Sequence, residues 1–311
     1  MSRLNRRTFG MVAITAGMLA PVASAAVIFA TGQNNGDPTH QTGNYYYRID
    51  TATGVATPVS PLLSGSAPSG LSSVGTQLVG FKDGQHGTID PFAGLFSPVG
   101  TANGFSITGY EVLSGFGYGV PTAGTERRLQ RVDLVTSAAT SLGTGNPIGD
   151  ALDTFFGNPA GTNAPFIIGL GSVGNTLYGV HLGTNKNNLV ALNPSTGDAT
   201  VIGAPNAVGT SGNLGSGAFS GFSAMTGVDE DFDGTTDALF GNVNFFDPDA
   251  GGPLASQRFG GVVRYDLSAG TWTLVGNNPG LIFFGFGSPV PEPTGLALLA
   301  CAAAMLVAGR R

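Results

Sequence analysis

The chain has 311 residues, of which 41% are hydrophobic and 10% are charged, and its net charge at pH 7 is −6. This hydrophobic share excludes an intrinsically disordered protein. The 51 glycines and 19 prolines favour short strands joined by many turns. The stretch from Val27 to Ser288 contains 18 acidic and 8 basic residues. Nucleic-acid binding needs clustered cations, and beyond Arg127 and Arg128 we find no cluster, so we expect no nucleic-acid partner.

The first 25 residues have the features of a bacterial export signal. Basic residues at Arg3, Arg6 and Arg7 precede an apolar stretch, and Ala23-Ser24-Ala25 supplies the small residues of a cleavage site. We predict a signal peptide over residues 1–25 that is cleaved between Ala25 and Ala26; a retained membrane anchor is the alternative. Arg6-Arg7-Thr8-Phe9 also resembles a twin-arginine signal, although its flanks depart from that pattern. The general secretory and twin-arginine routes therefore both stay open.

The body of the chain, residues 26–288, contains five copies of one pattern. Each copy has an apolar residue, Asp or Asn, two variable residues, Thr or Ala, a Gly and then an alternating stretch. The copies begin at Arg48, Thr88, Arg131, Ala191 and Arg264. An Asp or Asn side chain can accept hydrogen bonds from turn amides, and Gly permits a positive φ. Because these positions recur, we interpret them as hairpin turns and not as a site. The turn acceptors are Asp50, Asp90, Asp133, Asn193 and Asp266, and the glycines are Gly54, Gly94, Gly197 and Gly270, with Ser137 as the exception.

Further strand-like runs precede each copy, so that each unit has four short strands. The second strands are expected at residues 27–30, 78–81, 117–120, 177–180 and 239–242. Repeated units of this kind resemble a β-propeller, in which radial stacking protects the sheet edges. We predict an all-β propeller of five four-stranded blades; six or seven stay open, because a divergent blade could lie near residues 150–165 or 204–221. The first unit lacks its opening strand, and we predict that the run at 280–286 completes it and closes the ring.

Aromatic residues in two of the units admit more than one interpretation. Alternation along Tyr45-Tyr46-Tyr47 places Tyr46 on the face opposite its neighbours. Either exposed contact residues or an edge strand would explain this run. For Trp272, in the fifth hairpin, we expect packing between blades.

The strongest local signal for a ligand is the acidic segment 229–237. Its carboxylates alternate, and Gly234 permits a sharp turn, so that several hard oxygens could converge on one Ca²⁺. Phe240 stands where an EF-hand would have Glu, and the stretch instead resembles the calcium loops of integrin-type FG-GAP propeller repeats. The resemblance implies one structural Ca²⁺. A solvated acidic loop is the alternative, although four like charges held close would repel one another. The ligands we expect are Asp229, Asp231, Asp233, the carbonyl of Thr235, and Asp237.

We predict no catalytic and no cofactor-binding residues. His40, His86 and His181 are scattered, and none has a ligand-like neighbour at short spacing. Residues 169–174 spell GxGxxG, but a strand-like run follows where a dinucleotide site needs a helix. The GxSxG motif of serine hydrolases is absent from the sequence. A catalytic group assembled from distant residues stays open.

Residues 289–311 differ from the body in composition. Val290-Pro291-Glu292-Pro293 comes first, an uncharged apolar run extends from Gly295 to Gly309, and Arg310 and Arg311 follow. Cys301, in the apolar run, is the single cysteine, so the body can have no disulfide. The three parts in this order resemble the PEP-CTERM sorting signal of bacterial surface proteins. The resemblance implies a short transmembrane helix that retains the chain in the inner membrane until an exosortase-type enzyme cuts near Pro-Glu-Pro. A plain C-terminal anchor is the alternative.

These features predict an exported protein of the cell surface or extracellular matrix with a non-enzymatic binding or scaffolding role. The partners we expect are exopolysaccharide or other surface proteins. The alternative is a secreted propeller hydrolase or lyase acting on polysaccharide, which would gather carboxylates, His or Arg at the mouth of the central channel. A purely structural surface-layer subunit is a third interpretation, and it would self-associate without a small ligand.

Overall fold

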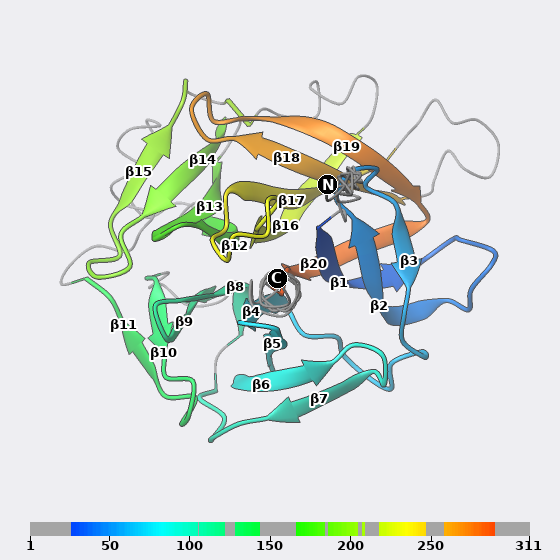
Figure 1. The fold of residues 1–311 in the computed structure, drawn as a ribbon, viewed down its shortest axis with the longest axis horizontal. Helices are drawn as coiled ribbons and strands as arrows, with labels where there is room; N and C mark the ends of the chain where they lie inside the picture. The colour runs from blue at the N-terminus through cyan, green and yellow to red at the C-terminus, as the bar shows by residue number, and fades with distance from the viewer. Residues whose placement is uncertain are drawn as a thin grey trace, which may run out of the picture.

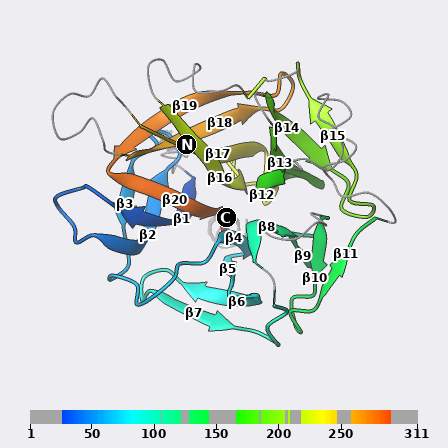
Figure 2. The same ribbon diagram turned by 180° about the vertical axis from the view of Figure 1, so that it is seen from behind.

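The computed structural model describes residues 26–104, 106–121, 128–143, 166–183, 186–204, 207–208, 218–246 and 258–289. These residues form five antiparallel sheets of four strands, arranged around a central axis as the blades of a β-propeller (Figure 1). The same ring is seen from behind in Figure 2. The predicted all-β propeller of five blades is confirmed.

The strands of each blade follow one another from the axis outwards. Blade 1 contains β20 (Leu281–Gly287), β1 (Val27–Asn34), β2 (Gly43–Asp50) and β3 (Ala56–Pro58). Blade 2 contains β4 (Gly70–Val74), β5 (Gln77–Lys82), β6 (Gln85–Asp90) and β7 (Leu95–Pro98). Blade 3 contains β8 (Ile107–Leu113), β9 (Phe116–Pro121), β10 (Gln130–Val132) and β11 (Ala139–Ser141). Blade 4 contains β12 (Phe166–Val173), β13 (Thr176–Gly183), β14 (Lys186–Leu192) and β15 (Ala199–Ile202). Blade 5 contains β16 (Ala218–Val228), β17 (Ala238–Phe246), β18 (Arg258–Asp266) and β19 (Thr271–Pro279).

The five sequence copies are the hairpins between the third and fourth strands of the five blades. In the first copy, Oδ1 of Asp50 accepts hydrogen bonds from the backbone N–H groups of Ala52 and Thr53, at 2.9 and 3.0 Å. Gly54 has a φ of 67° and donates its N–H to the Asp50 carbonyl at 2.8 Å. The other four acceptors make the equivalent bonds within their own turns. The prediction that these residues shape turns is therefore confirmed.

Ser137, the one exception to the glycine rule, adopts the same left-handed conformation with a φ of 60°. Its hydroxyl donates to the carbonyl of Val99 and accepts the N–H of His86 at 3.1 Å, and both partners belong to blade 2. Left-handed backbone is unfavourable for a residue with a Cβ. The two hydrogen bonds across the blade interface offset that cost.

Stacking of neighbouring blades buries both faces of each sheet. Tyr46 packs with Leu71 and Ile89 of blade 2, whereas Tyr45 and Tyr47 lie in the cluster shared with blade 5. All three tyrosines are buried, and β2 is the third strand of its blade. Neither sequence-based interpretation of these residues, as exposed contacts or as an edge strand, was correct. Trp272 packs edge-on against Phe222, in a cluster that joins blades 4 and 5, as expected.

The last strand of the body closes the ring. β20 pairs with β1 in antiparallel register, from Asn34 opposite Leu281 to Phe29 opposite Gly287. The prediction that this run completes the first blade is confirmed. Asn278 of β19 also joins blade 5 to the β2–β3 hairpin of blade 1, because its Nδ2 donates to the carbonyl of Gly54 at 3.0 Å and its Oδ1 accepts the N–H of Ala56 at 2.8 Å.

Direct hydrogen bonds between consecutive blades settle the blade number. Oγ1 of Thr108 in blade 3 donates to the carbonyl of Ile167 in blade 4 at 2.8 Å. The N–H of Gly174 in blade 4 donates to the carbonyl of Thr236 in blade 5 at 3.0 Å. No blade can therefore stand between blades 3 and 4 or between blades 4 and 5, and the alternatives of six or seven blades are wrong. The expected C-terminal helix lies outside the described residues, and within those residues no helix is long and apolar enough to cross a membrane.

We expect the turn of the fourth copy to depend on the acceptor and not on the charge of residue 193. Oδ1 of Asn193 accepts the N–H groups of Ser195 and Thr196, at 2.9 and 3.3 Å. Asn193→Ala should lower the free energy of unfolding by about 1 kcal/mol, because the turn amides lose their acceptor. Asn193→Asp should be close to neutral, because Asp performs this role in the other copies. Urea unfolding measures both, and an equal loss in the two variants would contradict the interpretation.

Candidate functional site

The acidic segment lies at the first hairpin of blade 5, between β16 and β17. Other blades have two-residue turns at this place, such as Gly75-Thr76 in blade 2 and Gly174-Asn175 in blade 4. The longer segment in blade 5 contacts the turn of blade 4, where the N–H of Gly174 donates to the carbonyl and to Oγ1 of Thr236, at 3.0 and 3.1 Å. The insertion is therefore attached to two blades.

Three of the predicted metal ligands come together in this segment. One carboxylate oxygen of each of Asp229, Asp231 and Asp233 lies within 4.8 Å of the others. Asp229 is only 2% exposed, and its two oxygens accept the N–H groups of Asp233 and Gly234, at 3.2 and 2.8 Å. Phe232 and Gly234 have positive φ angles of 61° and 95°, which fold the segment tightly enough to bring the carboxylates together.

The other two predicted ligands have different surroundings. Oδ1 of Asp237 accepts the N–H of Glu230 at 3.0 Å, and Asp237 does not belong to the group of three. Thr235 donates its N–H to Oδ1 of Asp233 at 2.8 Å. The N–H of Asp233 lowers the pKa of Asp231, but desolvation and the charges of the nearby carboxylates outweigh it and raise this pKa above its ordinary value. The segment thus concentrates negative charge without a basic partner inside the group of three.

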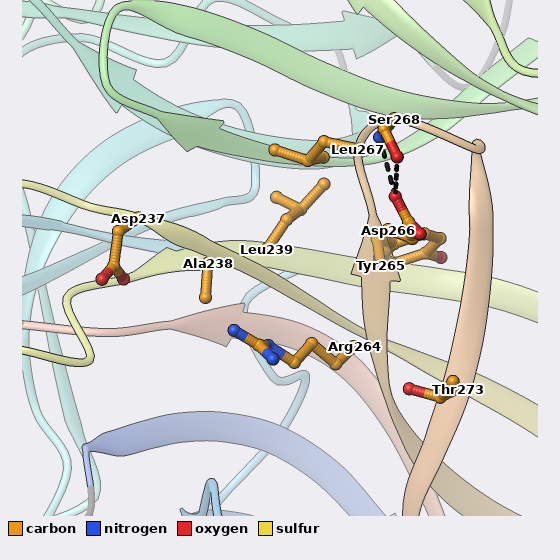
Figure 3. Close-up of a pocket in the computed structure, with 9 residues that line it drawn as sticks. All are labelled: Asp237, Ala238, Leu239, Arg264, Tyr265, Asp266, Leu267, Ser268 and Thr273. Carbon is orange, nitrogen blue, oxygen red and sulfur yellow. Dashed lines mark hydrogen bonds between the residues drawn. The ribbon is translucent and has the colours of Figure 1, made fainter.

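A pocket of about 450 Å³ lies beside the acidic segment, where β17 begins and β18 ends (Figure 3). Nη2 of Arg264 lies 2.5 Å from Oε2 of Glu230, and the Arg264 side chain is 51% exposed. Exposed ion pairs of this kind contribute about 0–1 kcal/mol. Figure 3 shows Asp266 bonded to Ser268 in its own turn, where Oδ1 accepts the N–H and the hydroxyl at 2.8 and 2.6 Å. Asp237, Arg264 and Asp266, the charged residues that line this pocket, thus take part in local hydrogen bonds or ion pairs.

The buried carboxyl of Glu111 is a feature that sequence reasoning missed. Glu111 lies on β8, the innermost strand of blade 3, and is 5% exposed. Its Oε1 accepts the hydroxyl of Ser172 at 2.6 Å, and its Oε2 accepts the hydroxyl of Ser72 at 3.2 Å. These serines lie on the innermost strands of blades 4 and 2. The one available signal was a single charged residue within the apolar run 107–113.

Burial raises the pKa of Glu111 to about 8, although the hydroxyls of Ser172 and Ser72 and the N–H of Ser172 act in the opposite direction. A carboxyl group with this pKa is mostly protonated at neutral pH. Protonation removes the large cost of burying a negative charge without a cation. Glu111 is thus mostly neutral at neutral pH, and its own O–H can donate in one of the two hydrogen bonds that link the three blades.

The three histidines lie on three different blades, which agrees with their scattered positions in the sequence. His86, on β6, has its Nδ1 2.7 Å from the hydroxyl of Tyr110, and burial lowers the pKa of its imidazole. His181, on β13, is fully buried, which lowers its pKa to about 4. Within the part of the chain that the structure describes, Asp229, Asp231 and Asp233 are the only group of three potential metal ligands.

The predicted processing residues lie at or beyond the edge of the described chain. Ala26, which follows the predicted cleavage point, is buried, and its carbonyl accepts the hydroxyl of Thr51 at 2.9 Å. The remaining residues of the two signals lie outside the described ranges, namely Ala23, Ala25, Val290, Pro291, Glu292, Pro293, Arg310 and Arg311.

Comparison with known proteins concerns the fold alone. No family model and no curated protein matches the chain. The nidogen–laminin complex contains a similar chain, with 10% identity, a TM-score of 0.46 and coverage of 86% of this chain and 99% of that chain. A quinoprotein alcohol dehydrogenase-like protein from Bacteroides thetaiotaomicron has 9% identity, a TM-score of 0.37 and coverage of 84% and 68%. Puromycin hydrolase has 12% identity, a TM-score of 0.35 and coverage of 84% and 37%. These similarities assign no function.

We expect the stability of the protein to depend on the protonation of Glu111. A free glutamate has a pKa near 4.5, whereas Glu111 has a pKa of about 8. The folded state therefore binds the carboxyl proton more tightly than the unfolded state does. The stability that protonated Glu111 contributes is fully present below about pH 4.5 and is lost as the pH rises through about 8. The substitution Glu111→Gln keeps the shape of the side chain but removes its titratable group.

Melting curves between pH 5 and pH 9 measure this dependence. The melting temperature of the wild type should fall relative to that of Glu111→Gln as the pH rises, and the variant should be the more stable protein at pH 9. The difference between the two curves isolates one group from the other titrating side chains. Parallel curves over this range would show that Glu111 does not carry a raised pKa.

Proposed function

We propose that the chain is an exported five-bladed propeller, displayed at the cell surface or in the extracellular matrix, that binds or scaffolds other surface components without catalysing a reaction. The main support is that the closed ring comprises the residues between the two signal-like segments. β1 begins at Val27, two residues after Ala25 of the predicted cleavage point, and β20 ends at Gly287, three residues before Val290-Pro291-Glu292-Pro293. Removal of both terminal segments would therefore keep every strand that the structure describes.

The proposed sorting step is compatible with the way the ring closes. Because β20 completes blade 1, a cut on its N-terminal side would open the ring, whereas a cut near Pro-Glu-Pro leaves all five blades intact. Proline favours an extended backbone and has no N–H for a helical hydrogen bond, so a segment with two prolines suits binding to an exosortase-type enzyme as a strand. The apolar run after it would hold the chain in the inner membrane until that step.

The lining of the central axis favours a binding role over the polysaccharide hydrolase or lyase. A cavity of about 310 Å³ opens on the face where the inner strands begin, and residues of all five blades line it. Among the described residues that line this cavity, none is Asp, Glu, His, Lys or Arg. General acid–base or nucleophilic hydrolysis requires such groups near the substrate. Exopolysaccharide and other surface proteins are the partners that we propose.

Surface display can be tested by changing the sorting motif. In a bacterium that carries an exosortase system, replacement of Pro291, Glu292 and Pro293 by Ala should leave the protein uncut in the inner-membrane fraction, because the enzyme loses its recognition segment. Pro289→Ala, just outside the motif, is the matched control and should be processed normally. Cell fractionation with immunoblotting measures both. Normal release of the triple variant would contradict the proposed sorting route.

We also propose one structural Ca²⁺ in the acidic segment of blade 5. Asp229, Asp231 and Asp233 fit this ion, since three carboxylate oxygens already lie within 4.8 Å of one another. The carbonyl of Thr235 and the carboxylate of Asp237 are the further ligands that the FG-GAP-like pattern suggests. When bound, the ion supplies positive charge that cancels the repulsion within the segment. Because Thr236 bonds to Gly174, the ion would also strengthen the contact between blades 4 and 5.

A calcium-dependent melt tests this site. The full chain should melt several degrees higher in millimolar Ca²⁺, because an ion at 100 times its dissociation constant adds about 2.7 kcal/mol to stability. Asp231→Ala and Asp233→Ala should abolish the shift. Asp198→Ala removes an exposed carboxylate of another hairpin and should keep it. If wild type shows no shift at millimolar Ca²⁺, or if both loop variants keep the shift, then the segment is a solvated acidic loop.

A further inference from the structure

The cavity on the central axis is built from equivalent positions in all five blades. Each blade contributes one residue of its innermost strand, or in blade 2 the residue just before that strand. Each of these residues lies two positions before the level at which the strands close together. These residues are Ser69, Thr108, Ile168, Ser223 and Phe284. Ala67, Pro68, Ile107 and Phe222 complete the wall. We refer to this cavity, with its volume of about 310 Å³, as the axial cup.

The axial cup is closed at its lower end. One level deeper, the space lined by Leu71, Tyr110, Leu170, Met225 and Phe286 holds no volume for a water molecule. The backbones of neighbouring strands approach closely here, and glycine makes this approach possible. A Cβ at Gly109 would lie 2.7 Å from the nitrogen of Leu170, and a Cβ at Gly70 would lie 2.6 Å from the nitrogen of Tyr110. The axis therefore forms a blind cup and not a channel, so a ligand can enter from one face only.

The hydroxyl groups of the cup present oxygen acceptors. Oγ1 of Thr108 donates its proton to the carbonyl of Ile167 at 2.8 Å, and Oγ of Ser69 donates to the carbonyl of Phe81 at 3.4 Å. A hydroxyl has one proton and two lone pairs, so each oxygen can still accept a donor. Ser223 differs, because its hydroxyl donates to the carbonyl of Phe283 and accepts a hydrogen bond from Nδ2 of Asn242 at 3.1 Å. A ligand in the cup would therefore donate hydrogen bonds to Thr108 and Ser69.

The remaining wall is apolar and uncharged. Phe284 is half-buried on the wall, and the other apolar lining residues include Phe222, Ile107, Ile168 and Pro68. An aromatic ring offers a flat apolar face for stacking. An ion entering this site would lose its water without gaining a partner of opposite charge, which is unfavourable. The lining thus selects an uncharged ligand that has both an apolar face and hydroxyl donors.

A neutral sugar ring has this combination of properties. We propose that the axial cup binds a neutral sugar residue, with its apolar face against Phe284 and its hydroxyls donating to Thr108 and Ser69. The proposal rests on the surface-binding role and specifies its ligand. Since the cup is small and closed at its lower end, we expect it to take a free sugar or the end of a polysaccharide.

Saturation-transfer nuclear magnetic resonance with the full chain tests the proposal. The probes are the methyl glycosides of glucose, galactose, mannose and N-acetylglucosamine, with methyl glucuronide and methyl galacturonide as charged counterparts of the first two. At least one neutral glycoside should bind at millimolar concentration, and the uronides should bind at least tenfold more weakly. If no neutral glycoside binds, or if a uronide binds as tightly as its neutral counterpart, the proposal is wrong.

Two variants locate the binding in the cup. Ala67→Trp places an indole at the wall and should abolish binding, whereas Ala93→Trp, in the exposed turn of blade 2, should leave it unchanged. Thr108→Val keeps the volume but removes the acceptor, and should weaken binding by about three- to tenfold. Melting curves confirm that each variant is folded. Unchanged binding in folded Ala67→Trp or Thr108→Val would place the sugar elsewhere and overturn the assignment.

The source of the sugar and the proposed function are tested separately. A neutral tetrasaccharide of the residue that binds should keep its affinity if the cup takes chain ends, and should lose it if the cup takes only the free sugar; either result supports the cup. Fractionation of the sorting variants reports surface display whether or not sugar binds. Failure of the cup would therefore leave the surface role standing, and failure of export would not remove a measured sugar affinity.

Discussion

The pairing of β20 with β1 is the interaction on which the rest of the ring depends. It joins the last strand of the body to the first, and it completes blade 1 from both ends of the chain. Without it, β1 would be an open sheet edge at the axis and Tyr47 would lose its contact with Phe283, at a centroid distance of 5.9 Å. The interfaces of blade 1 with blades 2 and 5 both need this strand. Blade 1 therefore cannot be completed until β20, at the end of the body, is present.

Close approach of the inner strands is the second constraint, and it determines where ligands can bind. Gly70 and Gly109 lie against the backbone of the next blade with no room for a Cβ, so the middle of the axis is filled by backbone. On one side of this level lies the axial cup, and on the other lies Glu111 between Ser72 and Ser172. The cup is open and neutral, whereas the carboxyl is enclosed. The same packing thus separates a ligand-accessible surface from a structural buried acid.

The features that could be predicted from the sequence are local or repeated. Asp50 and Gly54 shape a turn within a few residues, and five copies made that role recognisable. The closing strand could be predicted because the first unit lacked its opening strand, and the strand-like run at 280–286 was followed by no further repeat. Glu111 could not, because its partners Ser72 and Ser172 lie 39 and 61 residues away and meet it only in the closed ring. The tyrosines of β2 were misinterpreted because alternation implies one buried face, whereas stacked blades bury both.

β16 connects the proposed sites to the closure of the ring. Ser223, on this strand, lies in the wall of the axial cup and donates to the carbonyl of Phe283 on β20. At the end of the same strand the chain enters the acidic segment, in which Asp229 is buried and Thr236 bonds to blade 4. An ion held by the acidic segment would anchor the end of β16 against blade 4, while β20 holds its middle against blade 1. Calcium and ring closure would then stabilise the same strand from two sides, and the attachment to β20 lies in the wall of the cup.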